Sequence, residues 1–232
     1  MIKKQSIEIG DIPSVLFGPE TDKLFIAVHG DQSDKNDTVI TIFAEEAAQK
    51  GYQVLSFDLP EHGGRQNESR QCDPKNCTED LSKIMAYACE ISDDISLFGC
   101  SIGAYFGMLA YQDKPIKQSL FFSPVVDMKR IIHNMMAWFD VSEEQLKREK
   151  TVATPAKTLY WDYYQEVLKR PIRRNHPTTI LYGEKDTLCE SEYMKTFAEK
   201  TNADLTILED GKHYFHTENQ LTFYRNWLKQ KI

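Results

Sequence analysis

One serine stands between two glycines in the stretch GCSIGAY, residues 99–105, directly after the apolar run ISLF. A strand that turns sharply into a helix leaves no room for side chains two residues before and after the turning residue, so glycines at these places permit the turn. The Ser101 hydroxyl would then be exposed at the carboxyl end of the strand, next to the N-terminus of the following helix. The stretch predicts a nucleophilic serine.

A serine hydroxyl is a poor nucleophile at neutral pH unless a histidine accepts its proton and an acid orients that histidine. His213 follows the last predicted strand, and we prefer it to His216, three residues further on. For the acid, Asp186 also follows a predicted strand, and Asp127 is its rival, which could instead cap a helix. Because the carboxyl ends of parallel strands meet at one edge of a sheet, we expect a triad of Ser101, Asp186 and His213.

Short apolar runs alternate with longer amphipathic stretches, which is typical of strands and crossover helices in a mostly parallel sheet. The runs lack polar alternation, as in strands buried on both faces. The predicted strands are 6–10 and 14–18, an opening hairpin turned at Asp11 and Pro13, then 23–30, 52–58, 95–99, 118–124, 178–186 and 204–210. The predicted helices are 38–52, closed by Gly51, 78–92, with Thr78 as N-cap, one from about Ser101, and 218–229. These elements predict one doubly wound α/β domain over residues 1–232.

An insertion interrupts this alternation before the strand that precedes Asp186. It covers about fifty residues, 128–177, which is too long for an ordinary connection. They contain two helix-like stretches, 128–139 and 157–170, with the charged SEEQLKREK between them. The insertion is either an extra pair of core helices or a helical lid over a pocket. As a lid, its aromatic and Met side chains would favour an apolar or aromatic substrate group. The expected substrate contacts are Met135, Trp138 and Trp161.

The composition restricts the possible partners. With 232 residues, 41% hydrophobic and 27% charged, the chain is typical of one folded domain. The net charge of −7 argues against nucleic acid, which needs a basic surface. The sequence has no apolar stretch typical of a secretory signal or a membrane span, so we expect a cytoplasmic protein without a membrane partner.

The five cysteines lack the paired CxxC spacing of a zinc or redox site, so we expect reduced thiols and no metal. Cys72 and Cys77 could hold a metal only with a second pair of ligands, which the neighbouring sequence lacks. Cys100 is expected to point away from the serine into the fold.

The chain resembles an α/β-hydrolase over nearly its full length. The segments VHGD, FDLPEHGGR, GCSIG, YGEKD and DGKHYF occur in the order of that family. Within the family, the chain is similar to single-domain serine esterases with a helical insertion before the acid strand. The resemblance implies an eight-stranded, mostly parallel sheet and structural rather than catalytic roles for His29 and His62.

The resemblance also implies that two backbone N–H groups bind the oxyanion. They belong to Ile102 and to Asp31, which follows His29-Gly30, and Gln32 is the alternative to Asp31. This sequence departs from the HGGG motif of lipases, because an acid follows the glycine. A carboxylate beside a developing oxyanion is unfavourable unless it faces solvent or pairs with a cation.

The expected reaction is two-step acyl transfer without a cofactor, on a small to medium carboxylic ester. Thioesters, amides and peptides are alternative substrates of the same triad. Two other hypotheses are a binding protein that keeps the fold without catalysis and a different enzyme on this scaffold, such as a haloperoxidase-like or C–C bond hydrolase. The sequence does not indicate an oligomeric state.

Overall fold

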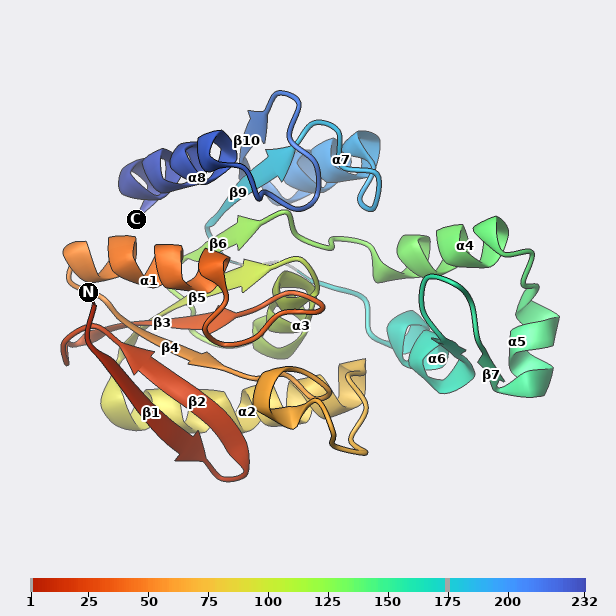
Figure 1. The fold of residues 1–232 in the computed structure, drawn as a ribbon, viewed down its shortest axis with the longest axis horizontal. Helices are drawn as coiled ribbons and strands as arrows, with labels where there is room; N and C mark the ends of the chain where they lie inside the picture. Colours follow the sequence, from red (N-terminus) through yellow and green to blue (C-terminus); the bar gives the residue numbers. More distant parts are fainter. Residues whose placement is uncertain (1, 174–175) are drawn as a thin grey trace.

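An eight-stranded sheet runs through the centre of the computed structural model, which describes residues 2–173 and 176–232. The strand order is β1-β2-β4-β3-β5-β6-β9-β10 (Figure 1). The β1–β2 and β2–β4 pairs are antiparallel, and the other pairs are parallel. The strands of this sheet are β1 Lys4–Ile9, β2 Ile12–Phe17, β3 Lys23–Val28, β4 Gln53–Phe57, β5 Asp94–Cys100, β6 Ser119–Phe122, β9 Thr178–Gly183 and β10 Asp204–Leu208. The predicted eight-stranded, mostly parallel sheet is therefore confirmed.

Helices cover both faces of the sheet (Figure 1). Buried side chains of α1 and α8 pack in one apolar cluster, and those of α2, α3 and α7 pack in a second cluster on the opposite face. The bounds of these helices are α1 Thr38–Gln49, α2 Pro74–Ile91, α3 Ile102–Tyr111, α7 Ser191–Thr201 and α8 Glu218–Lys231. None of the helices described is long and apolar enough to cross a membrane.

Two of the helices that cover the sheet differ from the prediction. α2 begins at Pro74 rather than near Thr78, because the Asp73 carboxylate caps it by accepting the Asn76 N–H at 2.7 Å, and proline is favoured in a first turn. The Thr78 hydroxyl instead donates to the Pro74 carbonyl. α7 was not predicted, since only Met194 and Ala198 of its side chains are buried and the apolar periodicity is weak.

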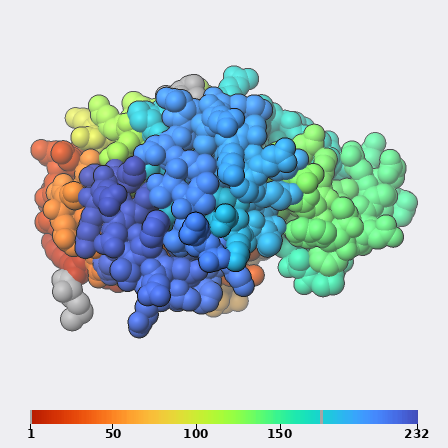
Figure 2. Space-filling model, turned by 90° about the horizontal axis from the view of Figure 1, so that it is seen from above, coloured from red at the N-terminus to blue at the C-terminus, as the bar shows by residue number. Residues whose placement is uncertain are grey.

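The insertion between β6 and β9 contains three helices and a short strand pair, and it projects beyond one end of the sheet (Figure 1). In the space-filling view its residues, in green, form one end of the molecule (Figure 2). Its buried apolar side chains belong to the same cluster as those of α2 and α3. The charged stretch that was expected to separate two helices is itself helical, and residues 174 and 175 of the predicted insertion lie outside the described residues. The elements are α4 Met128–Trp138, α5 Glu143–Glu149, β7 Thr151–Val152, β8 Leu159–Tyr160 and α6 Trp161–Lys169.

The turn from β5 into α3 is as tight as the two glycines indicate. Ser101 has φ 50° and ψ −118°, a conformation that costs free energy for a residue with a side chain. A Cβ on Gly99 would lie 2.5 Å from the Ala104 Cα, and one on Gly103 would lie 2.3 Å from the His29 carbonyl oxygen. α3 can therefore pack against β3 and β5 at this distance only with glycine at both positions.

Gly103→Ala is expected to lower the free energy of unfolding by about 3 kcal/mol, because its Cβ would meet backbone atoms that cannot rotate away. Gly107→Ala in the same helix is the matched control, since its Cβ would meet only side-chain atoms of Leu97, at 3.1 Å. We expect the control to stay within about 1 kcal/mol of the wild type. Urea unfolding followed by circular dichroism compares the variants, and equal midpoints for the two would contradict the packing argument.

Candidate active site

Three side chains from separate loops form one hydrogen-bonded chain at the carboxyl edge of the sheet. The Ser101 Oγ lies 2.8 Å from the His213 Nε2, and the His213 Nδ1 lies 2.6 Å from the Asp186 Oδ2. Ser101 follows β5, Asp186 follows β9 and His213 follows β10. The structure thus brings together the serine, acid and histidine that the sequence singled out.

Local bonds hold the acid in place. The Asp186 carboxylate is buried, and its Oδ1 accepts the backbone N–H groups of Leu188 and Cys189 at 2.8 and 3.0 Å. Only Oδ2 is therefore directed at His213. Since Oδ2 accepts a hydrogen bond from the Nδ1–H group, the ring proton stays on Nδ1, and the unprotonated Nε2 is free to accept a proton from Ser101.

The rival residues have other partners. Asp127 is the N-cap of α4, where its Oδ1 accepts the Arg130 N–H at 2.9 Å. His216 is exposed, its Nδ1 lies 3.2 Å from the Tyr214 carbonyl and its N–H donates to Gln220. Neither residue contacts the chain from Ser101 to Asp186 in the described part of the structure.

Two cations face the carboxylate of Asp31. The His62 Nε2 and the Lys157 Nζ lie 3.1 and 2.8 Å from the Asp31 Oδ1. Lys157 belongs to the insertion, between β7 and β8, so this pair connects the insertion to the loop after β3. A carboxylate beside an oxyanion must face solvent or pair with a cation, and Asp31 pairs with two cations.

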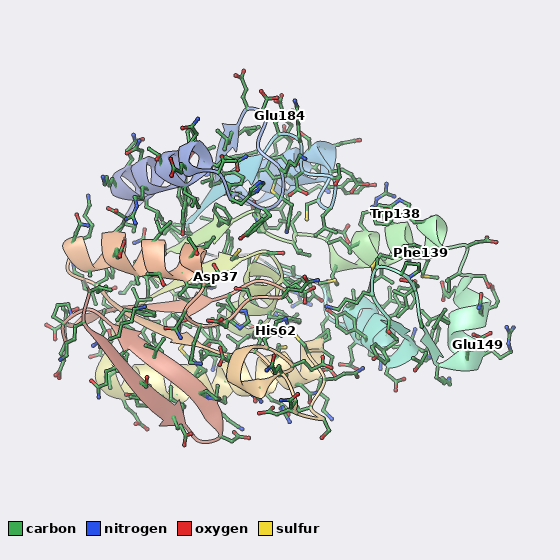
Figure 3. All side chains as sticks on the ribbon, in the orientation of Figure 1. Asp37, His62, Trp138, Phe139, Glu149 and Glu184 are labelled. Atoms are coloured by element: carbon green, nitrogen blue, oxygen red, sulfur yellow. The ribbon has the colours of Figure 1, made fainter. Side chains whose placement is uncertain are left out.

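His62 lies in the loop after β4 (Figure 3), where its Nε2 faces the Asp31 carboxylate of the loop after β3. Its Nδ1 lies 2.7 Å from the Pro60 carbonyl oxygen, so both ring nitrogens face acceptors. Burial of the ring acts to lower the pKa of His62, but hydrogen bonds with Asp31 and Cys72 outweigh it and raise that pKa to about 10. His62 is accordingly an imidazolium at neutral pH.

His29 is a buried neutral ring. Its Nδ1 donates to the Gly30 carbonyl at 2.7 Å, and its Nε2 accepts the Leu59 N–H at 3.0 Å. Burial lowers the pKa of His29 to about 4, so the ring stays uncharged and joins the loops after β3 and β4.

The predicted oxyanion donors border the same space as the serine. Ile102 is the first residue of α3, where a backbone N–H has no partner within its own helix. Asp31 follows Gly30, and the backbone of Gly30 lies close to Ser101: a Cβ added to Gly30 would lie 3.3 Å from the Ser101 Cβ. Asp31, Ser101 and Ile102 line one cavity together, whereas Gln32, the alternative donor, lines a second cavity that Ile102 does not border.

Two cavities meet at Ser101. The first, of about 250 Å³, is largely apolar and is here called the insertion-side cavity. The second, of about 390 Å³, lies towards α1 and is here called the α1-side cavity. The insertion-side cavity is lined by Asp31, Glu61, Gln71, Cys72, Ser101, Ile102, Val125, Met128, Ile131, Ile132, Met135, Ala156, Lys157, Thr158, Leu159, Tyr160, Tyr163 and Leu188. The α1-side cavity is lined by His29, Gly30, Asp31, Gln32, Ser33, Asp37, Val39, Ile40, Cys100, Ser101, Phe122, Leu188, His213 and Tyr214.

Of the three predicted substrate contacts, the structure brings only Met135 to a cavity. Trp138 is 57% exposed at the end of α4 (Figure 3), and Trp161 packs against Tyr164 and Lys150 instead. Trp138 and Trp161 were expected to face the substrate, but neither side chain lines one of the two cavities. Residues that the sequence reasoning missed, among them Tyr163 and Lys157, occupy the wall.

Cys100 differs in part from its expected place. It packs against the apolar cluster of α1 and α8, but it also lines the α1-side cavity. Cys100 is therefore part of the site wall as well as of the core.

One group of possible metal ligands overlaps the triad. Ligand atoms of Asp186, Cys189 and His213 lie within 4.8 Å of one another. Burial raises the pKa of the Cys189 thiol well above its usual value, and a protonated thiol is a poor ligand. Since the Asp186 oxygens already accept three N–H groups, we assign no metal to these residues.

Solved structures of similar shape are known. Est1E from Butyrivibrio proteoclasticus with bound ferulic acid has a TM-score of 0.82 and 19% identity, covering 98% of this chain and 97% of that chain. Alpha/beta hydrolase domain-containing protein 10 from mouse has a TM-score of 0.75 and 13% identity, covering 99% and 98%. The thioesterase domain from the curacin biosynthetic pathway has a TM-score of 0.64 and 15% identity, covering 98% and 99%. No family model and no curated protein matches the sequence.

Proposed function

We propose that this chain, which has the α/β-hydrolase fold, is a serine hydrolase that cleaves carboxylic esters through an acyl-enzyme on Ser101. The observation that carries the proposal is the hydrogen-bonded chain from the Ser101 Oγ through His213 to the buried Asp186. The Ser101 side chain makes no capping bond to its own helix, so its hydroxyl is available to His213. A strained, uncapped serine aligned with a base is what nucleophilic catalysis requires.

In the first step, the His213 Nε2 takes the hydroxyl proton of Ser101 as its Oγ attacks the ester carbonyl. The negative charge on the carbonyl oxygen is stabilised by the N–H groups of Ile102 and Asp31, aided by the positive end of α3. His213 then gives the proton to the leaving alcohol. Water releases the acyl group by the same route, with His213 again as the base.

The cavities suggest how an ester is seated. The insertion-side cavity has apolar walls from Met128, Ile131 and Met135, which suit an aliphatic or aromatic group. The α1-side cavity is larger and includes His213, beside which the alcohol must leave. We therefore propose that the acyl group enters the insertion-side cavity and that the insertion acts as the lid of this cavity.

An ester of p-nitrophenol tests the proposal. With the acetate and the butyrate, we expect a burst of p-nitrophenol equal to the enzyme concentration, followed by slower turnover, because p-nitrophenol is a good leaving group and hydrolysis of the acyl-enzyme is then the slower step. The matching S-acyl thioesters, run beside them, test the alternative substrate class. Absence of any burst or turnover with both classes would contradict the proposal in favour of a protein that binds without catalysis.

The partners of Asp31 give a further prediction. Lys157→Met is expected to lower kcat for the butyrate by about two- to fivefold, because it leaves a carboxylate less compensated beside the oxyanion. The matched control is Lys157→Arg, which keeps the charge. Asp31→Asn in the Lys157→Met background should restore kcat, since it removes the repulsive charge. A double variant slower than Lys157→Met would contradict this role of Asp31.

A further inference from the structure

Two thiols meet at the start of α2, in the wall of the insertion-side cavity. Cys72 precedes the N-cap Asp73, and Cys77 lies in the first turns of the helix. Side chains at these two positions, N′ and N4, regularly touch across a helix start. The Sγ atoms of Cys72 and Cys77 lie 3.6 Å apart, and both residues are buried.

Charged and polar groups surround the Cys72 side of the pair. The Cys72 N–H donates to the Glu61 carboxylate at 2.7 Å, while His62, Lys157 and the Tyr163 ring approach from other elements. The hydrogen bond from Cys77 lowers the pKa of the Cys72 thiol, burial opposes it, and His62 and Lys157 lower it further. The net direction is below the ordinary value, so a larger fraction of Cys72 is thiolate at neutral pH than in an ordinary thiol.

The other thiols in the core behave in the opposite way. Burial raises the pKa of Cys77, and the neighbouring Cys72 raises it further. Burial also raises the pKa of Cys100 and Cys189. Cys72 is therefore the buried thiol most prone to react as a thiolate.

Access distinguishes the two members of the pair. Cys72 lines the insertion-side cavity, whose volume of about 250 Å³ admits small molecules. Cys77 is fully buried behind it. A small oxidant that enters the cavity would meet Cys72 first, with Cys77 next to the product.

We propose that Cys72 and Cys77 form a thiol pair that hydroperoxides oxidise reversibly to a disulfide in the wall of this cavity. The Cys72 thiolate attacks one peroxide oxygen, which breaks the O–O bond and yields Cys72 sulfenic acid and hydroxide. The Cys77 thiol then attacks the Cys72 sulfur, forms the S–S bond and releases water. The hydroxide takes up the proton that the Cys72 thiol released when it became a thiolate, so in total two thiols lose two hydrogens and hydrogen peroxide becomes two waters.

The local geometry suits this step and gives it a structural consequence. The sulfurs, now 3.6 Å apart, need to approach by about 1.5 Å to bond. Formation of the disulfide removes the negative charge of the Cys72 thiolate from the surroundings of His62 and Lys157. Both of these cations also contact the Asp31 carboxylate. The oxidation state of the pair therefore changes a wall that is shared with Ser101. The thiol chemistry itself does not depend on the proposed function.

Intact mass of the whole chain tests the proposal. Reduced wild-type protein treated with hydrogen peroxide is expected to lose about 2 Da, regained with dithiothreitol. Cys89→Ser, which removes an exposed cysteine of α2, should lose the same mass. Cys77→Ser should not lose it, and its Cys72 sulfenic acid should instead be captured by dimedone. No loss in the wild type, or an equal loss in Cys77→Ser, would overturn the proposal.

The pH dependence of the reaction is a second readout. The rate of the mass loss in the wild type should follow a thiolate that forms well below the usual thiol pKa of about 8.5. His62→Gln removes one of the two cations that lower the pKa of Cys72, and its rate profile should move to higher pH. A wild-type profile centred near or above the usual thiol pKa would contradict the proposal without any variant.

Discussion

Ser101→Ala is expected to lower kcat for p-nitrophenyl butyrate by at least about 10⁴-fold, because no other described hydroxyl lies within hydrogen-bond distance of the His213 Nε2. The KM should change little, since the methyl group leaves the cavity walls in place. The variant should be at least as stable as the wild type, because Ser101 makes no capping bond whose loss would weaken α3.

The control for this variant is an independent check of the fold. Circular dichroism and thermal unfolding should match the wild type, so that a loss of turnover reports on the chemistry. A folded Ser101→Ala protein with more than about 1% of the wild-type kcat would contradict Ser101 as the nucleophile, since removal of a triad member costs far more than that.

Asp186→Asn is expected to lower kcat by about 10⁴-fold. Two backbone N–H groups face the Asp186 Oδ1, so an asparagine would keep its oxygen there and direct its NH₂ at His213. The Nδ1 must then accept a hydrogen bond, which places the ring proton on Nε2. In that tautomer His213 cannot take the proton of Ser101.

Asp127→Asn is the matched control. Asparagine is as good an N-cap as aspartate, so α4 should stay folded and kcat should remain within about twofold of the wild type. Steady-state kinetics of the two variants at neutral pH compare the two acids directly. A larger loss of kcat in Asp127→Asn than in Asp186→Asn would contradict the assignment.

The triad candidates could be predicted because their positions follow from topology. Each of Ser101, Asp186 and His213 lies shortly after the end of a parallel strand, and such ends share one edge. A strand pattern together with residue type was therefore sufficient to nominate them. The start of α2 could also be predicted from the local sequence. The Asp73-Pro74 pair is a typical helix start, although Thr78 was chosen as the N-cap.

Contacts between distant loops could not be predicted in this way. Lys157 meets Asp31 across 126 residues, and no local pattern indicates that pairing. The sequence also does not predict which side chains of α4 and α6 face the cavity, because this depends on how the two helices pack against each other. Trp138 is for that reason exposed, while the less conspicuous Tyr163 lines the cavity.

The most direct test of the proposed acyl-enzyme is labelling with a fluorophosphonate, which forms a stable bond with an activated serine. We expect one adduct for each wild-type chain, located by peptide mass spectrometry on the peptide that contains Ser101. Ser101→Ala should take up no label, and Asp186→Asn should react much more slowly than Asp127→Asn. A folded wild-type protein that takes up no label, or takes it up at another residue, would contradict the account.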